Sequence, residues 1–198
     1  MKKQKLRKQN VRTMSIWVKL LTPVIIVVLG VCILLSSFSY MTLQEKMIKM
    51  GQIQAQSVAS LTATILDAKS IGQLTIPGEE NSATYKAQQA LLISSQKNGN
   101  VLYLYTLYTD GSKVYYGVDA DVTPQACKIG DEFELSYQEL KHVFDGEKYV
   151  EAEIDSRNRE HLLTAYTPIK TDEGKVTGIL ACDFDASTIV NELNNSRL

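Results

Sequence analysis

The sequence predicts an α+β protein in which an N-terminal transmembrane helix continues into a long helix packed on a five-stranded antiparallel sheet. Three observations support this prediction. The 198-residue chain has no charged residue between Lys19 and Glu45. A helical pattern then continues to about residue 66 without a proline. The remainder holds five segments of strand-like composition, separated by turn residues.

The uncharged stretch has the length and composition of a membrane span. A helix rises about 1.5 Å per residue, so about 20 apolar residues cross the hydrocarbon core, and we place the span at residues 16–40. The first 19 residues contain seven Lys or Arg and no acid, and such basic flanks stay in the cytoplasm. We therefore expect a basic cytoplasmic tail (1–15) and a single-pass protein of the cell membrane, with residues 41–195 extracytoplasmic. A cleaved signal peptide is the alternative, which the long basic region disfavours.

The domain expected outside the membrane is acidic, although the whole chain has a formal net charge of −1. Seven of the 21 Lys and Arg lie in the first 19 residues, so the rest of the chain has 14 basic against 22 acidic residues. Nucleic-acid binding needs a basic surface, so this class of partner is excluded. About 150 residues remain beyond the span, which is enough for one hydrophobic core.

Local patterns place the elements of this domain. Apolar residues at steps of three and four, including Met47, Met50 and Ile53, extend the first helix to about residue 66. Further helices are predicted at 83–96, 136–144 and 185–193. Aromatic and β-branched residues predict strands at 101–109, 113–119, 149–156, 161–170 and 175–184. Gly178, inside the last strand, predicts a close approach of backbone or ligand.

Residue patterns typical of enzymes are missing. The chain has two His residues, and neither lies in a nucleophile, phosphate-loop or zinc pattern. The acids Asp183 and Asp185 share a strand face, but no calcium loop surrounds them. We therefore expect no enzymatic activity, no metal and no other cofactor. The spacing leaves open whether Cys127 and Cys182 form a disulfide.

Strand alternation places an acid on the face opposite the apolar residues of the last strand. Successive side chains point to opposite faces, so Leu180, Cys182 and Phe184 suit packing on the long helix while Asp183 faces the other way. A carboxylate among apolar residues is costly unless it is paired. We therefore expect a cationic ligand near Asp183, or a structural hydrogen bond to a neighbouring loop.

Several tyrosines are candidates for the same pocket, because each has an apolar body and a polar tip. Tyr103 and Tyr105 share one strand face, and Tyr116 and Tyr108 are expected to point away. Arg159, at a turn, is a candidate partner for a ligand carboxylate. Each candidate also has a purely structural interpretation, as an ordinary core residue or as a solvated charge in a turn. The predicted ligand-binding residues are Asp183, Tyr166, Tyr103, Tyr105, Tyr115 and Arg159.

Three strings near the C-terminus resemble those of Cache domains, the PAS-like sensor modules of bacterial receptors. They are Phe144-Asp-Gly146, Ala165-Tyr-Thr-Pro-Ile-Lys170 and residues 173–189, and they follow the family's order. The resemblance covers about residues 40–195 and implies a single PAS-like unit that binds small molecules. It also implies that Asp183, the first acid of the closing Asp-x-Asp, contacts a ligand amino group. The Arg-x-Trp-Tyr run of amino-acid-binding members is absent from residues 128–137.

The expected function is small-molecule sensing by the extracytoplasmic domain of a chemotaxis-type signal-transduction receptor. The expected ligand is a small polar metabolite of the amino-acid, amine or carboxylate class, bound between the sheet and residues 123–148. The resemblance implies a homodimer through the N-terminal helix. No second membrane helix follows in the sequence, which leaves open a receptor fragment or a lone anchored sensor. The alternative is a ligand-free anchored interaction or assembly protein on the same scaffold.

Overall fold

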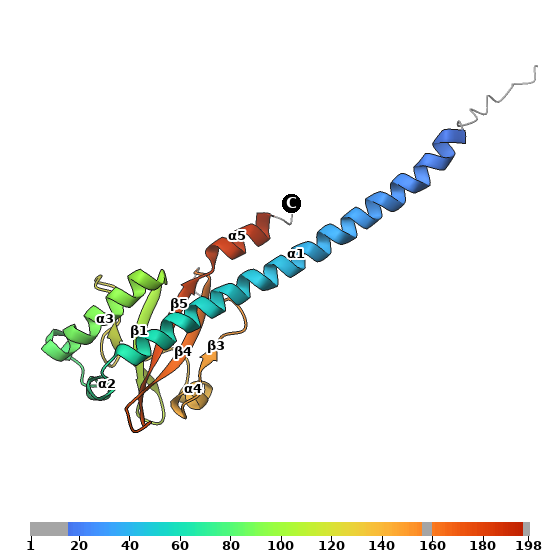
Figure 1. The fold of residues 1–198 in the computed structure, drawn as a ribbon. Coiled ribbons are helices and arrows are strands. Elements are labelled where there is room, and N and C mark those ends of the chain that lie inside the picture. The colour runs from blue at the N-terminus through green and yellow to red at the C-terminus, as the bar shows by residue number, and fades with distance from the viewer. Residues whose placement is uncertain (1–15, 156–159, 196–198) are drawn as a thin grey trace, which may run out of the picture. The chain divides into compact units, whose positions relative to one another are not determined.

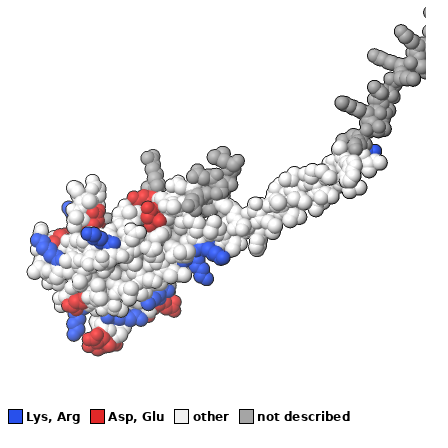
Figure 2. All heavy atoms as spheres, turned by 45° about the horizontal axis from the view of Figure 1, so that its top comes forward, with Lys and Arg blue, Asp and Glu red and all other residues white. Residues whose placement is uncertain are grey.

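The computed structural model describes residues 16–155 and 160–195, and it has the predicted α+β fold (Figure 1). Two compact units, Met1–Leu43 and Gln44–Leu198, divide the chain. Helix α1 (Ile16–Ile65) begins in the first unit, where its large apolar side chains are exposed and no Asp or Glu occurs. Apart from Lys19 near its start, this part of the helix has an uncharged surface (Figure 2). Among the described residues, α1 is the one helix with the length and hydropathy of a membrane span.

The second unit is built on an antiparallel sheet of five strands in the order β2-β1-β5-β4-β3. The strands are β1 (Tyr103–Thr109), β2 (Val114–Asp119), β3 (Tyr149–Val150), β4 (Leu162–Lys170) and β5 (Val176–Asp185). The further helices are α2 (Ala68–Gln73), the 3-10 turn η1 (Glu79–Asn81), α3 (Ala83–Gly99), α4 (Tyr137–Phe144) and α5 (Ser187–Asn195).

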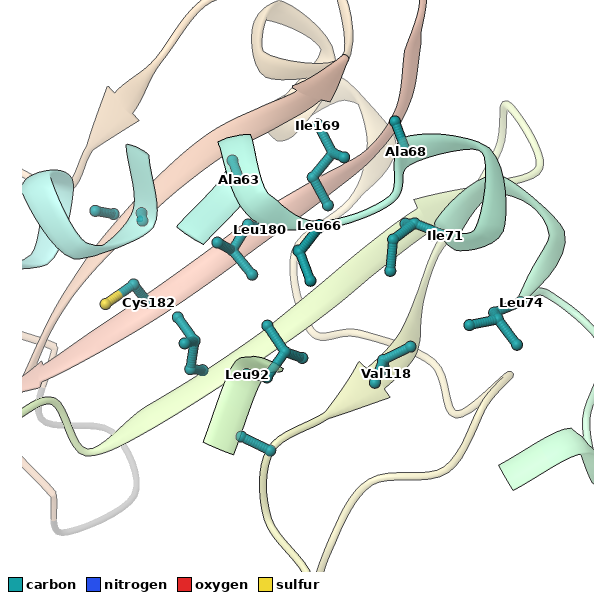
Figure 3. Packing of buried hydrophobic residues seen from close by; sticks show 14 of the residues in the cluster. Ala63, Leu66, Ala68, Ile71, Leu74, Leu92, Val118, Ile169, Leu180 and Cys182 are labelled. Carbon is teal, nitrogen blue, oxygen red and sulfur yellow. The ribbon is translucent and has the colours of Figure 1, made fainter. Parts of the chain in front are cut away.

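One face of the sheet, here called the helix face, packs against α1, α2 and α3 (Figure 3). As predicted, β5 contributes Leu180 and Cys182 to this face, and both are fully buried. Helix α2 places Ile71 and α3 places Leu92 in the same cluster. Burying aliphatic side chains of this size contributes about 1.5–3 kcal/mol each, so this layer supplies much of the stability of the domain.

Helix α1 contacts the helix face through small residues. Ala55, Ala59 and Ala63, four residues apart, are buried, and a Cβ on Gly51 would lie 3.0 Å from Leu163 and Phe184 side-chain atoms. The large residues of the predicted apolar series mostly point elsewhere. Those with more than half of their surface exposed are Met50, Ile53, Leu61 and Ile65.

The opposite face, here called the aromatic face, is covered by α4 and by the segment that follows β2. Its buried cluster includes Tyr105, Phe133, Leu140 and Tyr166. Helix α4 begins at Ser136, whose capping box with Glu139 is present as the sequence predicted. The two faces of the sheet therefore differ in composition, because one is aliphatic and the other is rich in tyrosine and phenylalanine.

The structure corrects two details of the predicted elements. The strand predicted at 149–156 pairs regularly only at Tyr149 and Val150, with a single bridge from Asp155 to Leu162. One reason is that Gln52 of α1 donates a hydrogen bond of 2.8 Å to the Glu151 carbonyl oxygen. The predicted helix 83–96 continues to Gly99.

Two open points of the sequence analysis are resolved. Cys127 and Cys182 are both free. At Gly178 the close neighbour is protein, because a Cβ there would lie 3.0 Å from the Leu107 carbonyl oxygen and 3.3 Å from Ile71. The glycine therefore permits tight strand and helix packing.

Candidate functional site

The strand register places Asp183 in the centre of the aromatic face. Tyr103 of β1 and Thr164 of β4 are its direct cross-strand partners. Tyr105 and Tyr166 stand in the next row, on either side of Ala181. Directly opposed residues in such a sheet have Cβ atoms about 4.5–5.5 Å apart. The common face predicted for Asp183 and these three tyrosines is therefore confirmed, whereas their contact with a ligand stays a prediction.

Asp183 is a buried acid with incomplete hydrogen bonding. Its side chain is 4% exposed, and its Oδ1 has no hydrogen-bond partner among the described residues. Burial raises the pKa of this carboxyl to about 7, although the nearby Thr164 and Tyr105 hydroxyls lower it. Two acids, Glu151 and Glu134, raise the pKa further. A cation beside Oδ1 would supply the missing partner and favour the ionised form.

Aromatic rings cover this acid. The ring of Phe133 lies 6.1 Å from that of Tyr105 and 6.5 Å from that of Tyr166. Tyr116 contacts both Tyr105, at 5.1 Å, and Phe133, at 5.3 Å. Phe133 belongs to the segment after β2 and is held there by a 2.8 Å hydrogen bond from its N–H to the Val114 carbonyl oxygen. Ring faces of this kind attract cations within about 6 Å.

The structure reverses the predicted faces of the two adjacent tyrosines in β2. Tyr115 stacks on Tyr108 at 5.4 Å and donates a hydrogen bond of 2.9 Å to Asp110, away from Asp183. Tyr116 instead pairs with Leu107 and lies on the aromatic face. The reason is the hairpin register: Thr109 pairs with Val114 and Leu107 with Tyr116, so next to the turn the odd positions of β1 face the even positions of β2. The expectation that Tyr115 shares a face with Tyr103 and Tyr105 is wrong.

Acidic groups surround the aromatic face. The Tyr103 hydroxyl donates to Glu160 Oε1 at 2.9 Å, and burial together with this acid raises the pKa of Tyr103 to about 12. The Tyr166 hydroxyl donates to Glu151 Oε1 at 3.3 Å. Sequence reasoning missed both acids, although alternation from Tyr149 places Glu151 on this face. The predicted Arg159 lies outside the described residues.

A cleft of about 670 Å³ adjoins this acidic edge. It is lined by the start of α4 and the chain after β3, and it includes Leu135, Tyr149 and Glu151. Asp183 does not line this cleft itself, but the Tyr166–Glu151 hydrogen bond lies between them. Among the described residues, no group of three or more His, Cys, Asp or Glu could hold a metal ion.

No protein-family model matches the chain, and a search of curated proteins gives no match. Solved structures do match. The sensor domain of DcuS from E. coli is 19% identical, covers 75% of this chain and 98% of its own, and superposes with a TM-score of 0.53. The sensor domain of the histidine kinase DctB from V. cholerae is 13% identical, covers 78% of this chain and 58% of its own, and gives a TM-score of 0.54.

A third match is the ligand-binding domain of the Campylobacter jejuni chemoreceptor Tlp3 in complex with 4-methylisoleucine. It is 17% identical and covers 77% of this chain and 61% of its own, with a TM-score of 0.48. At these identities the likeness to the DcuS and DctB domains shows the fold alone. The chain therefore has the PAS-like fold of Cache-type sensor domains, as the sequence resemblance predicted.

Proposed function

We propose that this chain is a membrane-anchored sensing domain whose ligand is a small metabolite that bears an ammonium group. The observation that supports this proposal is the buried Asp183 carboxyl, whose Oδ1 has no partner among the described residues. A buried polar group left without a hydrogen bond costs about 1–3 kcal/mol. An ammonium group would donate the missing hydrogen bond and would neutralise the ionised acid.

The surroundings of Asp183 favour a cation over an anion. Glu151 and Glu134 raise the pKa of Asp183, and Glu160 accepts a hydrogen bond from the Tyr103 hydroxyl. A ligand carboxylate would therefore meet like charge there. The rings of Tyr105 and Phe133 offer faces to a cation, each worth about 0.5–1 kcal/mol at an exposed site. We therefore expect amines to bind better than carboxylates. An amino acid would also need a partner for its carboxylate, the role predicted for Arg159.

Ligand entry requires a change in the ring cluster that covers Asp183. Apart from a bridge between Tyr115 and Glu132, the segment 120–136 has no strand or helix, and it contributes Phe133. A ligand that favours an arrangement with this ring displaced would shift the population toward that arrangement. In this proposal, ligand binding also shifts the sheet against α1, which packs on the other face through Ala55 and Ala59. Output through a chemotaxis-type receptor stays a prediction.

The proposal is tested by thermal unfolding of the full chain in detergent micelles against ethylamine, 1,4-diaminobutane, L-alanine and succinate. A ligand at 100 times its dissociation constant adds about 2.7 kcal/mol, or roughly 5–10 °C for a domain of this size. We expect an amine to give this shift and succinate to give none. Asp183→Asn should abolish the shift, while the matched control Asp185→Asn, two residues along the same strand and exposed, should keep it.

A flat response to a broad amine and amino-acid panel by the folded chain would contradict the proposal and favour the ligand-free scaffold. An amine response that Asp183→Asn leaves unchanged would contradict the assigned site. Far-UV circular dichroism of each variant separates these outcomes from a failure to fold.

We further propose that α1 anchors the domain in the cell membrane, with the basic tail cytoplasmic, and forms a homodimer. Met47 packs beside α5, but large apolar residues beyond it remain exposed on one side of the helix. In native membranes, oxidation of Ser57→Cys should give a covalent dimer, whereas Lys97→Cys on α3 should not. The exposed residues of this stripe are Met50, Ile53, Leu61 and Ile65.

A further inference from the structure

A second cleft, of about 470 Å³, lies at the other face of the sheet. The end of α1, the start of α2, the turn after α4 and the end of β4 form its walls. Thr167 marks its side of the sheet, because it pairs with Leu180 of the helix face and accepts a hydrogen bond from Gln56 of α1. This cleft is therefore separated from Asp183 by the thickness of the sheet.

Three lysines, Lys69, Lys148 and Lys170, line the cleft. The Lys148 ammonium donates to Ser60 Oγ and the Lys170 ammonium donates to the Gly146 carbonyl oxygen, both at 2.9 Å. Both acceptors are neutral, and none of the three lysines has an ion-pair partner within 4.0 Å in the described part of the chain. Each ammonium has three N–H donors, so Lys148 and Lys170 keep donors for a ligand.

The turn after α4 positions one of these lysines. Gly146 has φ +107°, and a Cβ there would lie 3.0 Å from Lys170 Nζ. A glycine thus permits both the turn and the approach of the ammonium to the Gly146 carbonyl oxygen. The Lys170 side chain is exposed, and this hydrogen bond fixes its ammonium at the wall of the cleft.

Two acids, Asp67 and Asp172, also line the cleft and offset part of the lysine charge. Neither forms an ion pair with the three lysines within 4.0 Å in the described part of the chain, and the Asp67 oxygens accept from the Lys69 N–H and the Ser70 hydroxyl. The Thr171 hydroxyl is buried and has no hydrogen-bond partner within 3.5 Å among the described residues, although its proximity lowers the pKa of the exposed Glu173 carboxyl. The hydroxyls that line the cleft are those of Ser60, Thr64, Thr167 and Thr171.

We propose that this cleft binds the phosphate group of a small soluble solute. Lysine ammonium groups act as point charges. Here they approach the cleft from α2 (Lys69), from the turn before β3 (Lys148) and from the end of β4 (Lys170). This suits a tetrahedral, multiply charged oxyanion. Among the described residues that line the cleft there is no arginine, the residue whose forked guanidinium best matches a planar carboxylate. This cleft would bind an anion, whereas the aromatic face would bind a cation. The phosphate proposal therefore does not depend on the proposed function.

The probe for the test is inorganic phosphate, added to the full chain in detergent micelles at constant ionic strength. We expect a saturable rise in the thermal midpoint. The variant Lys148→Gln/Lys170→Gln should weaken the apparent phosphate affinity at least ten-fold. Lys86→Gln/Lys97→Gln, an equal charge change on the exposed surface of α3, should leave the affinity unchanged. Asp183→Asn should also leave it unchanged, because that residue belongs to the other face.

The proposal is overturned if phosphate gives no saturable shift, or if the double lysine variant keeps the wild-type affinity. It is also overturned if succinate binds as tightly as phosphate, because the site would then not select a tetrahedral oxyanion. Circular dichroism of the phosphate-free double variant confirms that a lost response is a lost site and not a lost fold.

Discussion

Within the strands β1 to β5, the two faces of the sheet treat buried polar groups differently. On the helix face, Thr106 Oγ1 accepts a 2.7 Å hydrogen bond from the Val118 N–H, and Thr167 accepts one of 2.8 Å from Gln56. On the aromatic face, Asp183 is equally buried but keeps an oxygen without a partner among the described residues. Native proteins pair nearly all buried polar groups. Among these strand residues, the hydroxyls of the helix face are paired, whereas the aromatic face keeps an energetic cost that ligand binding would remove under the proposed function.

The largest expected effect comes from breaking the helix face. Leu180→Ala removes a fully buried side chain between β5 and the helices, and such truncations cost about 2–5 kcal/mol. Ile76→Ala, in the exposed turn before η1, should change the unfolding free energy by less than about 0.5 kcal/mol. Urea unfolding followed by near-ultraviolet circular dichroism measures both. Equal losses in the two variants would contradict the assignment of the helix face.

The second-largest expected effect is the pH dependence of the unfolding free energy that the buried Asp183 causes. Asp183 has a pKa of about 7 in the folded protein against 3.8 for an ordinary aspartate, so between these values the folded state binds more protons than the unfolded state. The unfolding free energy should therefore fall as pH rises from about 4 to 7, by about 1–4 kcal/mol, and the contribution should be constant above pH 7. Urea unfolding across this range should show a shallower fall for Asp183→Asn. Parallel curves for the two proteins would show that the acid does not titrate as described.

The smallest effect separates the two neighbouring tyrosines of β2. Tyr116→Leu removes a ring from the aromatic face and should weaken binding of the best amine about two- to five-fold. Tyr115→Leu removes a ring from the other side and should leave the affinity unchanged. Calorimetric titration of both variants gives the comparison. The opposite ranking would restore the face assignment that the sequence predicted.

Much of the fold could be predicted from the sequence because its signals are local. The uncharged run after Lys19, the capping box at Ser136 and the turns between strands all act within a few residues. Alternation alone placed Asp183 opposite Leu180 and Cys182, because β5 is a regular strand over this range. These predictions needed no knowledge of which strand lies beside which.

The remaining features depend on long-range pairing, which periodicity does not report. The faces of Tyr115 and Tyr116 depend on a four-residue hairpin loop, and a register shift follows between Tyr105 and Leu107. The packing side of α1 consists of alanines, whose weak hydrophobic signal was masked by the larger exposed residues of the same helix. Glu151 reaches the site only because the short strand β3 pairs with β4.

The most direct test of the central claim is calorimetric titration of the best-binding amine into the full chain at pH 6 and pH 8. The ammonium group is charged at both values, so a change in affinity reports the ionisation of its partner. With a pKa of about 7 for Asp183, we expect binding to be about ten-fold tighter at pH 8, and we expect Asp183→Asn to bind the amine at neither pH. Equal affinities at the two pH values in the unmodified protein would contradict the account.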